Sequence, residues 1–256
     1  MRSRLEAVAV LCAALALGAA AAHAEEASGY AGAYEKARRM TLEFPQQVQS
    51  FIVEEATRQP GMTGQARILR RGDRIRIEAS FPPPSGMPGG GFRTVSIYDG
   101  AKLWAVDPFI GAVEQDVSKW QSYPAEFFGW ELLGPDAKIT GTEKIVERNC
   151  FVVELGPSAL HVPYRRVWLD TGSLALMKAE WSQADPDGPA RMVLMASVFK
   201  KIDRNWEMPY EIRIWKDDVM WYASSIRTIG VNIKFSSDLL DPQKAAQQIK
   251  KNPKKK

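Results

Sequence analysis

The chain has 256 residues, of which 45% are hydrophobic, 25% charged and 10% aromatic. These proportions are typical of a globular protein with a packed core, and they exclude a disordered or collagen-like chain. The net charge of +4 comes from the two ends, because residues 25–243 contain 26 basic and 29 acidic residues. A nucleic-acid-binding protein needs a basic face rather than a basic end, so no nucleic-acid partner is expected.

Residues 1–24 have the pattern of a secretory signal peptide. Arg2 and Arg4 precede an apolar run over residues 8–22, and Ala22-His23-Ala24 is a small-x-small cleavage site. The apolar run is shorter than the roughly 20 residues that a transmembrane helix requires. The sequence therefore predicts cleavage after Ala24 and export, with no membrane anchor.

Cysteine usage gives little sign of enzymatic chemistry. Cys150 is the one cysteine after residue 24, which excludes an internal disulfide and a multi-cysteine metal site in that part of the chain. It leads into the apolar residues 151–153, as expected for a small buried hydrophobe. The alternative, a reactive thiol, would need a partner such as His161, eleven residues away.

A helix opens the mature chain, and short strands follow it. Residues 28–40 are rich in helix formers, with Tyr30, Ala33, Tyr34 and Ala37 at helical spacing. From residue 48 the pattern changes to strands separated by turns. We expect one domain over residues 25–243 and a flexible Lys-rich tail over 244–256.

Turn sequences place the strands. Asp99-Gly100 between two apolar runs predicts a hairpin, and Asp170-Thr171-Gly172 and residues 185–188 predict two more turns. Further strands are expected over 193–199, 210–215 and 219–229. Turns at intervals of about 8 to 15 residues without long intervening helices favour an antiparallel meander. A short helix within 120–133, ended by Gly134-Pro135, interrupts the strands and, like the first helix, caps or plugs a barrel.

More than about eight strands make a barrel that can enclose a ligand. The chain is rich in large apolar side chains, with 8 Trp, 7 Tyr, 10 Phe and 9 Met, which suit either a dry core or the walls of a lipophilic cavity. Alternation of apolar residues along the strands assigns twelve residues to the cavity wall. They are Ile75, Ile77, Val95, Ile97, Trp104, Val106, Val167, Leu169, Ile212, Ile214, Val219 and Trp221.

Several segments, in order along the mature chain, resemble the outer-membrane lipoprotein-sorting carriers, the LolA/LolB-like family. The clearest is SIYDGAKLWAVDPF at residues 96–109, where an Asp-Gly turn precedes a Leu-Trp pair and an Asp-Pro step. Others are Gly64-Gln65 with the Arg-rich hairpin to Glu78, VWLD at 167–170 with LALMKAE at 174–180, and FSSDLLDP at 235–242.

The resemblance implies an incomplete antiparallel β-barrel, a half-barrel meander, with short α-helices as a lid or plug over a hydrophobic cavity. It implies a periplasmic carrier of acylated lipoproteins or lipids between membranes, with an inner-membrane transporter and an outer-membrane acceptor as partners. It implies no catalysis, no metal and no cofactor. In the family an arginine on an early strand holds the lid closed; the matching position is Arg70 or Arg71, and we assign Arg71.

Three features depart from the family. Residues 82–91 form a long Pro/Gly loop that is either a flap touching ligand through Met87 or an inert connection. The Lys-rich end contacts anionic headgroups or an acidic partner, or simply solubilises the chain. The C-terminal meander is extended.

Three functional classes follow. The first is a monomeric lipid or lipoprotein carrier. The second is a non-enzymatic accessory or sensory module that binds a membrane exporter or another envelope protein. The third, an enzyme such as an esterase, has little support, because the chain has no Gly-x-Ser-x-Gly elbow, and the paired carboxylates Glu54 and Glu55 point to opposite faces of a strand.

Overall fold

The computed structural model describes residues 30–60, 62–83, 91–107, 109–116, 128–156, 162–203 and 206–251. The predicted signal peptide, the flap residue Met87, residues 120–127 of the expected internal helix and the last five residues lie outside the described residues.

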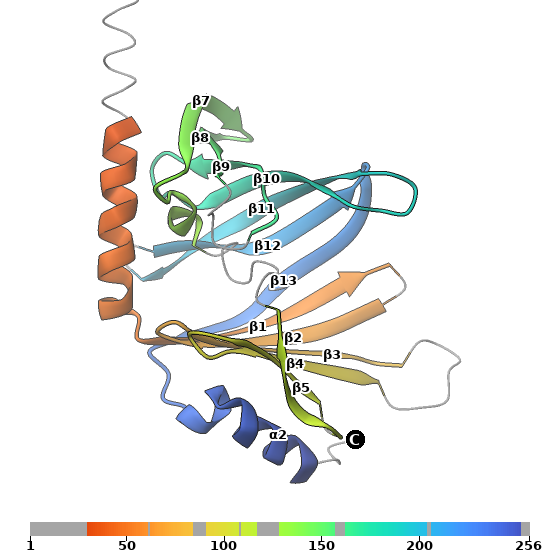
Figure 1. Cartoon of the computed structure of the whole chain (residues 1–256). Coiled ribbons are helices and arrows are strands. Elements are labelled where there is room, and N and C mark those ends of the chain that lie inside the picture. The colour runs from red at the N-terminus through yellow and green to blue at the C-terminus, as the bar shows by residue number, and fades with distance from the viewer. Residues whose placement is uncertain are drawn as a thin grey trace, which may run out of the picture.

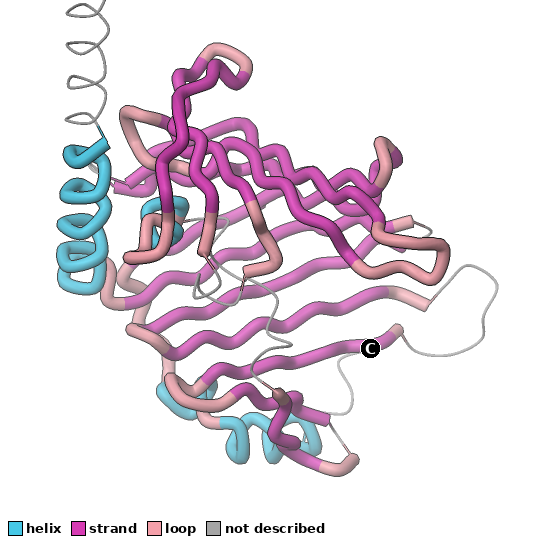
Figure 2. Tube along the Cα trace, turned by 45° about the horizontal axis from the view of Figure 1, so that its top comes forward, coloured by secondary structure: helices cyan, strands magenta, loops and turns pink. Residues whose placement is uncertain are grey.

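The described chain forms one antiparallel sheet of 13 strands in the order β6-β5-β4-β3-β2-β1-β13-β12-β11-β10-β9-β8-β7. The sheet curves strongly, and its edge strands β6 and β7 do not meet (Figures 1 and 2). This confirms the expected incomplete barrel. The strands are β1 (Ser50–Gln59), β2 (Met62–Arg71), β3 (Arg74–Phe81), β4 (Phe92–Tyr98), β5 (Leu103–Asp107), β6 (Gly111–Gln115), β7 (Lys138–Ile145), β8 (Arg148–Glu154), β9 (Arg166–Asp170), β10 (Leu176–Gln183), β11 (Ala190–Asp203), β12 (Trp206–Lys216) and β13 (Val219–Val231).

The Asp99-Gly100 hairpin between β4 and β5 is confirmed. Gly100 has a φ of 97°, a backbone conformation that residues other than glycine rarely adopt. Asp99 Oδ1 accepts the backbone N–H groups of Ala101 (3.0 Å) and Lys102 (2.9 Å), and Asp99 Oδ2 accepts the Trp104 indole N–H at 2.7 Å. One carboxylate therefore fixes both the turn and the first tryptophan of the next strand.

An N-terminal helix over residues 30–47 precedes the sheet and stands along one end of it (Figure 1). Ala33, Ala37, Met40 and Phe44 form its buried stripe at helical spacing. The helix predicted for residues 28–40 is confirmed from residue 30, and it continues past Pro45. Pro45 supplies no N–H for the carbonyl of Thr41, and the helix ends two residues after it, at residue 47.

The outer face of the sheet is covered near β3 to β6 by the 3-10 helix η3 (Ser237–Leu240) and the helix α2 (Pro242–Lys251). Ala245 and Ala246 of α2 pack with Val95, Ile97 and Val106 in a second core. The flexible tail expected from residue 244 is therefore corrected: this segment is helical to Lys251, because its small apolar residues share one helix face.

Arg76 links this outer layer to the sheet. Its guanidinium donates to the Leu239 carbonyl of η3 at 2.8 Å and to Glu78 at 2.5 Å, and Glu78 also accepts from Arg93 at 2.5 Å. Burial alone would raise the pKa of Glu78, but Arg76 and Arg93 outweigh it and hold that pKa below its ordinary value.

We expect Glu78→Gln to destabilise the protein at pH 7 and not at low pH. A carboxylate whose pKa is lowered by folding contributes stability above its unfolded-state pKa of about 4.3, and this contribution is lost as the pH falls through the folded-state value. The expected fall in melting temperature is about 4 °C at pH 7. Thermal unfolding of both proteins from acid to neutral pH measures it, and a gap that stays constant across this range contradicts the assignment.

Candidate functional site

The concave face of the sheet carries the main core. Register places Val53, Ile68 and Ile77 side by side on this face, across β1, β2 and β3. On the other half, Leu169 of β9, Leu194 of β11 and Ile212 of β12 belong to the same core and are buried. The concave face is therefore a continuous apolar surface reaching across both halves of the bent sheet.

Two elements cover this apolar surface, and we call them the lid: the N-terminal helix and the 3-10 helix η2 (Gly129–Leu132). The centre of the lid is an aromatic cluster. Trp130 lies with its ring centroid 5.6 Å from Phe44, 5.1 Å from Phe128 and 5.1 Å from Trp206. Phe128 in turn lies 5.4 Å from Phe51 of β1. The cluster joins the helix, η2 and the strands through side-chain packing.

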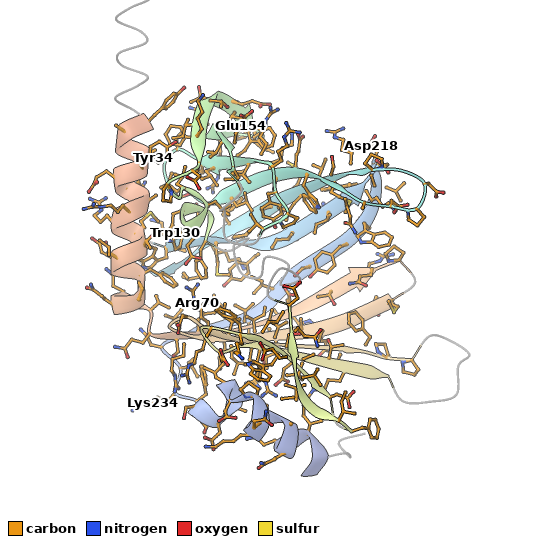
Figure 3. The ribbon with its side chains drawn as sticks, in the orientation of Figure 1. Tyr34, Arg70, Trp130, Glu154, Asp218 and Lys234 are labelled. Carbon is orange, nitrogen blue, oxygen red and sulfur yellow. The ribbon has the colours of Figure 1, made fainter. Side chains whose placement is uncertain are left out.

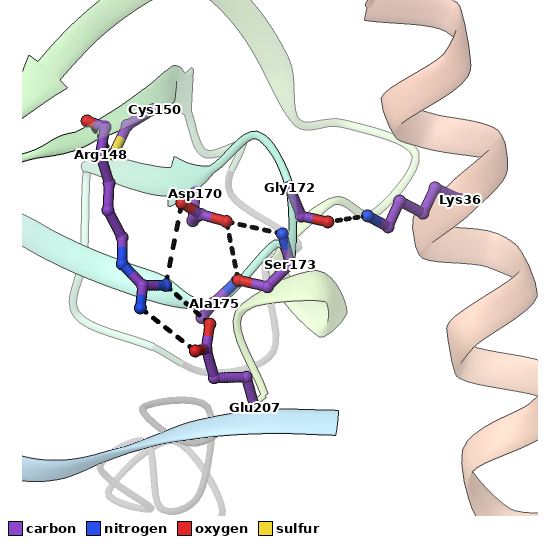
Figure 4. A network of polar contacts seen from close by, with 8 residues as sticks. All are labelled: Lys36, Arg148, Cys150, Asp170, Gly172, Ser173, Ala175 and Glu207. Carbon is purple, nitrogen blue, oxygen red and sulfur yellow. Dashed lines mark hydrogen bonds and ion pairs between the residues drawn. The ribbon is translucent and has the colours of Figure 1, made fainter. Parts of the chain in front are cut away.

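Polar contacts tie the lid to the sheet at its two sides. The Tyr34 hydroxyl donates to the Ala137 carbonyl at 2.8 Å and accepts from the Ile139 N–H at 2.9 Å. Lys36 donates to the Gly172 carbonyl in the β9–β10 turn (Figure 4). The helix is therefore held by individual side chains rather than by a strand ladder.

The β9–β10 turn is itself fixed by a polar network (Figure 4). Asp170 Oδ1 accepts from the backbone N–H and the hydroxyl of Ser173, at 2.6 and 2.8 Å. Arg148 bonds Glu207 of β12 at 2.6 Å and lies 3.8 Å from Asp170. The hydrogen bonds from Arg148 are the main cause that lowers the pKa of Glu207. This network gives Lys36 a rigid partner.

Arg70 is the arginine that contacts the lid (Figure 3). It donates to Glu131 of η2 at 3.2 and 3.3 Å, and its guanidinium lies 5.7 Å from the Phe44 ring centroid and 5.3 Å from that of Phe128. Arg70 thus touches both parts of the lid from the concave face.

The assignment to Arg71 is corrected. Arg71 donates to the Phe235 carbonyl and lies 4.4 Å from the Phe235 ring, so it holds the segment that follows β13. The physical reason is alternation: Ala66, Ile68 and Arg70 share one face of β2, while Arg71 faces the other way.

The twelve predicted wall residues divide between two faces. Six belong to the main core of the concave face or pack against it: Ile75, Ile77, Val167, Leu169, Ile212 and Ile214. Four lie on the outer face in or against the α2 core: Val95, Ile97, Trp104 and Val106. The reason is register, because Ile97 pairs with Arg76 rather than with Ile75 or Ile77, and Trp104 pairs with Ile97. A single wall of twelve residues is therefore corrected to two separate surfaces.

Val219 and Trp221 are on neither surface. They follow the Asp217-Asp218 turn at the end of the sheet away from the N-terminal helix (Figure 3) and are 69% and 47% exposed. A register shift between Ile214 and Trp215 interrupts the alternation that assigned them to the wall.

Sequence reasoning missed a buried polar group on the concave face. Glu55 is 2% exposed and accepts from the Ser224 hydroxyl and from Tyr222 at 3.4 Å. Thr57, two residues along the same face, has a buried hydroxyl that finds no hydrogen-bond partner among the described residues. The sequence could have shown that this polar group shares the apolar face, because Phe51, Val53, Glu55 and Thr57 lie at every second position of one strand and so point to the same side. These residues give the apolar surface a polar end.

Cys150 is buried in a third cluster with Trp168 and Met177, on the outer face of β8 to β10. Burial is the main cause that raises the pKa of its thiol to about 11. We expect alkylation of Cys150 to be at least about a hundredfold slower in the native protein than in the unfolded protein at pH 8. Peptide mass spectrometry after iodoacetamide treatment measures this, and comparable rates in both states contradict it.

Within the described ranges, no group of three or more His, Cys, Asp or Glu side chains could hold a metal ion. Of the helices in the same ranges, none has the length and apolar character to cross a membrane.

Comparison with known proteins matches no family model and no curated protein. Solved structures do match. A domain from Vibrio parahaemolyticus assigned to outer membrane lipoprotein sorting has a TM-score of 0.55 at 15% identity, covering 81% of this chain and 97% of that one. A DUF1329 family protein from Desulfovibrio piger has a TM-score of 0.56 at 16% identity, covering 82% and 96%. A LolA superfamily protein from Nitrosomonas europaea has a TM-score of 0.50 at 16% identity, again covering 82% and 96%.

These likenesses extend over most of both chains, and they agree with the open sheet and the helices described above. The resemblance read from the sequence segments is thereby confirmed at the level of the fold: the chain has the LolA-like fold.

Proposed function

We propose that the protein is a periplasmic carrier that binds the acyl chains of lipoproteins or lipids on the concave face and shuttles them between membranes. The observation that supports this most directly is an apolar face covered by a lid that is not part of the sheet. Trp130 and Phe44 pack where a ligand would lie, so the lid and the ligand compete for the same surface.

The energetics suit a carrier. Burying one CH2 group is worth about 0.8 kcal/mol, so an acyl chain of about 16 carbons gains more than about 10 kcal/mol relative to water. A membrane offers the same chain a similar gain. Because an empty carrier recovers part of this free energy by closing its lid, release into a membrane becomes favourable.

The polar end of the concave face would take the head of the acylated ligand. Glu55, Thr57 and Ser224 supply an acceptor and hydroxyl groups where the apolar residues stop. Export with cleavage after Ala24 belongs to the same proposal, as do an inner-membrane donor and an outer-membrane acceptor.

The test is photo-crosslinking with native mass spectrometry. The protein is purified from a periplasmic extract without detergent, and its mass is recorded before and after lipid extraction and after addition of a palmitoylated peptide. A photoreactive palmitoyl chain then reports the face that it touches. Crosslinks near Ile68, Leu194 or Ile212 support the proposal.

The α2 core provides the internal control, because Val95 and Ile97 are equally apolar and lie on the outer face. Crosslinks confined to that core, or a protein that neither retains lipid nor binds the palmitoylated peptide, contradict the carrier. The second outcome favours the accessory module that binds an envelope protein.

A further inference from the structure

A second concavity lies on the outer face of the sheet, on the side opposite to the lid. Its volume is about 750 Å3, and it extends over β3, β2, β1, β13 and β12. Most of the residues that line it occupy outward-facing positions, as Arg58, Gln65 and Arg213 show by their register. Thr57 and Ser224, which lie between these positions, also line it. We call it the outer groove. None of the twelve predicted wall residues lines it.

Strand register sets two arginines across the outer groove from one another. Arg58 of β1 pairs with Ala223 of β13, and Ala223 pairs with Arg213 of β12. Neighbouring strands are about 4.8 Å apart, so the two arginines start about 10 Å apart with an alanine between them. Their guanidinium groups can therefore meet above Ala223.

The floor of the outer groove is made of small residues. Ala56 and Ser225 pair in the row next to Ala223, and both line the groove. Small side chains on the floor with long arginines at the sides leave space that a ligand can enter. Thr63, Ser80 and Gln65 add uncharged hydrogen-bonding groups at the β2–β3 side.

Positive charge dominates the outer groove. Arg58, Arg213 and Arg227 line it, against one acidic residue, Glu211. Glu211 bonds Arg213 at 3.0 Å. Arg58 and Arg227 form no ion pair with any residue that the structure describes. The groove thus holds two arginines whose charge is not balanced by a described acidic side chain.

We propose that the outer groove binds a phosphate group of an organic ligand. A carboxylate is satisfied by one guanidinium, as Glu211 is by Arg213, whereas a phosphate has enough acceptor oxygens and charge for two or three guanidinium groups. The groove volume of about 750 Å3 lies within the range of about 300 to 1,000 Å3 that is typical of small-molecule sites, so the groove also accommodates the organic part. The site includes Thr57 and Ser224 of the polar end of the concave face, but none of the apolar residues Ile68, Leu194 and Ile212.

The phosphate could come from a lipid headgroup or from a soluble phosphate ester, and two probes distinguish them. The soluble probe is glycerol 3-phosphate, titrated into the full-length protein and followed by NMR of the arginine side chains. The membrane probe is vesicles of phosphatidylcholine with phosphatidylglycerol, compared with phosphatidylcholine alone in co-sedimentation. Saturable binding of either probe, with arginine shifts at Arg58 and Arg227, supports the proposal and identifies the source.

The variants are Arg58→Gln, Arg227→Gln and the conservative Arg58→Lys. Each exchange to Gln is expected to weaken binding about tenfold or more, because it removes charge-assisted hydrogen bonds. Arg58→Lys is expected to weaken binding as well, because an ammonium group lacks the planar fork. The matched control is Arg165→Gln, an exposed arginine outside the groove, which should leave binding unchanged.

Three results overturn the proposal: no saturable binding of either probe, equal weakening by Arg165→Gln, or tight binding of an oligoglutamate peptide in place of both phosphate probes. The last result would identify an acidic protein segment as the ligand. All four exchanges are at exposed positions, so thermal unfolding should be unchanged and the folded state is preserved. Failure here leaves the acyl-crosslinking test unaffected, because its positions Ile68, Leu194 and Ile212 do not line the outer groove.

Discussion

Trp130→Ala is expected to destabilise the protein by about 3 to 5 kcal/mol and, at the same time, to strengthen binding of an acyl chain. The side chain is 1% exposed and lies against Phe44, Phe128 and Trp206. Its removal leaves a cavity at the centre of the lid, which lowers the stability of the closed state. Because the lid competes with the ligand, each 1.4 kcal/mol lost by the closed state strengthens apparent ligand binding up to about tenfold while the closed state predominates.

The measurements are denaturant unfolding and titration with a palmitoylated peptide. Trp130→Phe is the matched control, because it keeps an aromatic ring in the cluster. It also removes a buried indole N–H that has no hydrogen-bond partner in the part of the chain that the structure describes, so its cost should be far smaller than that of alanine. Weaker ligand binding by a folded Trp130→Ala protein would show that Trp130 is part of the binding surface rather than its competitor.

Turn chemistry made much of the sheet predictable from the sequence. Asp99-Gly100 and Asp170-Thr171-Gly172 are local signals, since the side chain of each aspartate bonds backbone or side-chain groups within a few residues. The alternation in β3 is local as well. Such signals need no knowledge of the rest of the fold, so the strands that they bound are found where they were expected.

The faces of the strands were less predictable, because both sides of the sheet are covered in places. On β4 the apolar residues Val95 and Ile97 alternate as a wall should, yet they pack under α2 on the outer face. Alternation identifies which residues share a face but not what covers it. The covering helix comes almost 150 residues later in the chain, and nothing within β4 itself indicates that this helix packs on its outer face.

The choice between Arg70 and Arg71 shows a second limit of prediction from the sequence. The resemblance to the LolA-like family narrowed the choice to Arg70 and Arg71, which are adjacent in sequence and on opposite faces. The buried positions Ile68 and Leu69 give no help on their own, because both are fully buried, one under the lid and one on the outer face. Only the pairing of Arg70 with Phe51 and Ile75 places it beneath the lid.

Arg70→Ala is expected to cost about 2 kcal/mol, between the values for exposed and fully buried ion pairs, because the side chains of Arg70 and Glu131 are 16% and 20% exposed. The exchange removes the ion pair with η2 and the guanidinium from the rings of Phe44 and Phe128. A double-mutant cycle with Glu131→Gln separates the pair from the ring contacts. Arg67→Ala is the matched control, since its pair with Glu54 is 44% and 50% exposed and is worth less than about 1 kcal/mol.

A lid role for Arg70 makes a prediction beyond stability. Hydrogen exchange should accelerate in residues 30–47 and in η2, while β11 and β12 retain their protection, because lid opening leaves the strand ladder intact. Arg71→Ala should instead accelerate exchange near Phe235 and leave the lid unchanged. Palmitoylated-peptide binding should strengthen in Arg70→Ala alone, as an opened lid no longer competes for the concave face. Exchange that accelerates uniformly over the sheet and the lid would show that Arg70 stabilises the whole fold rather than the closed lid.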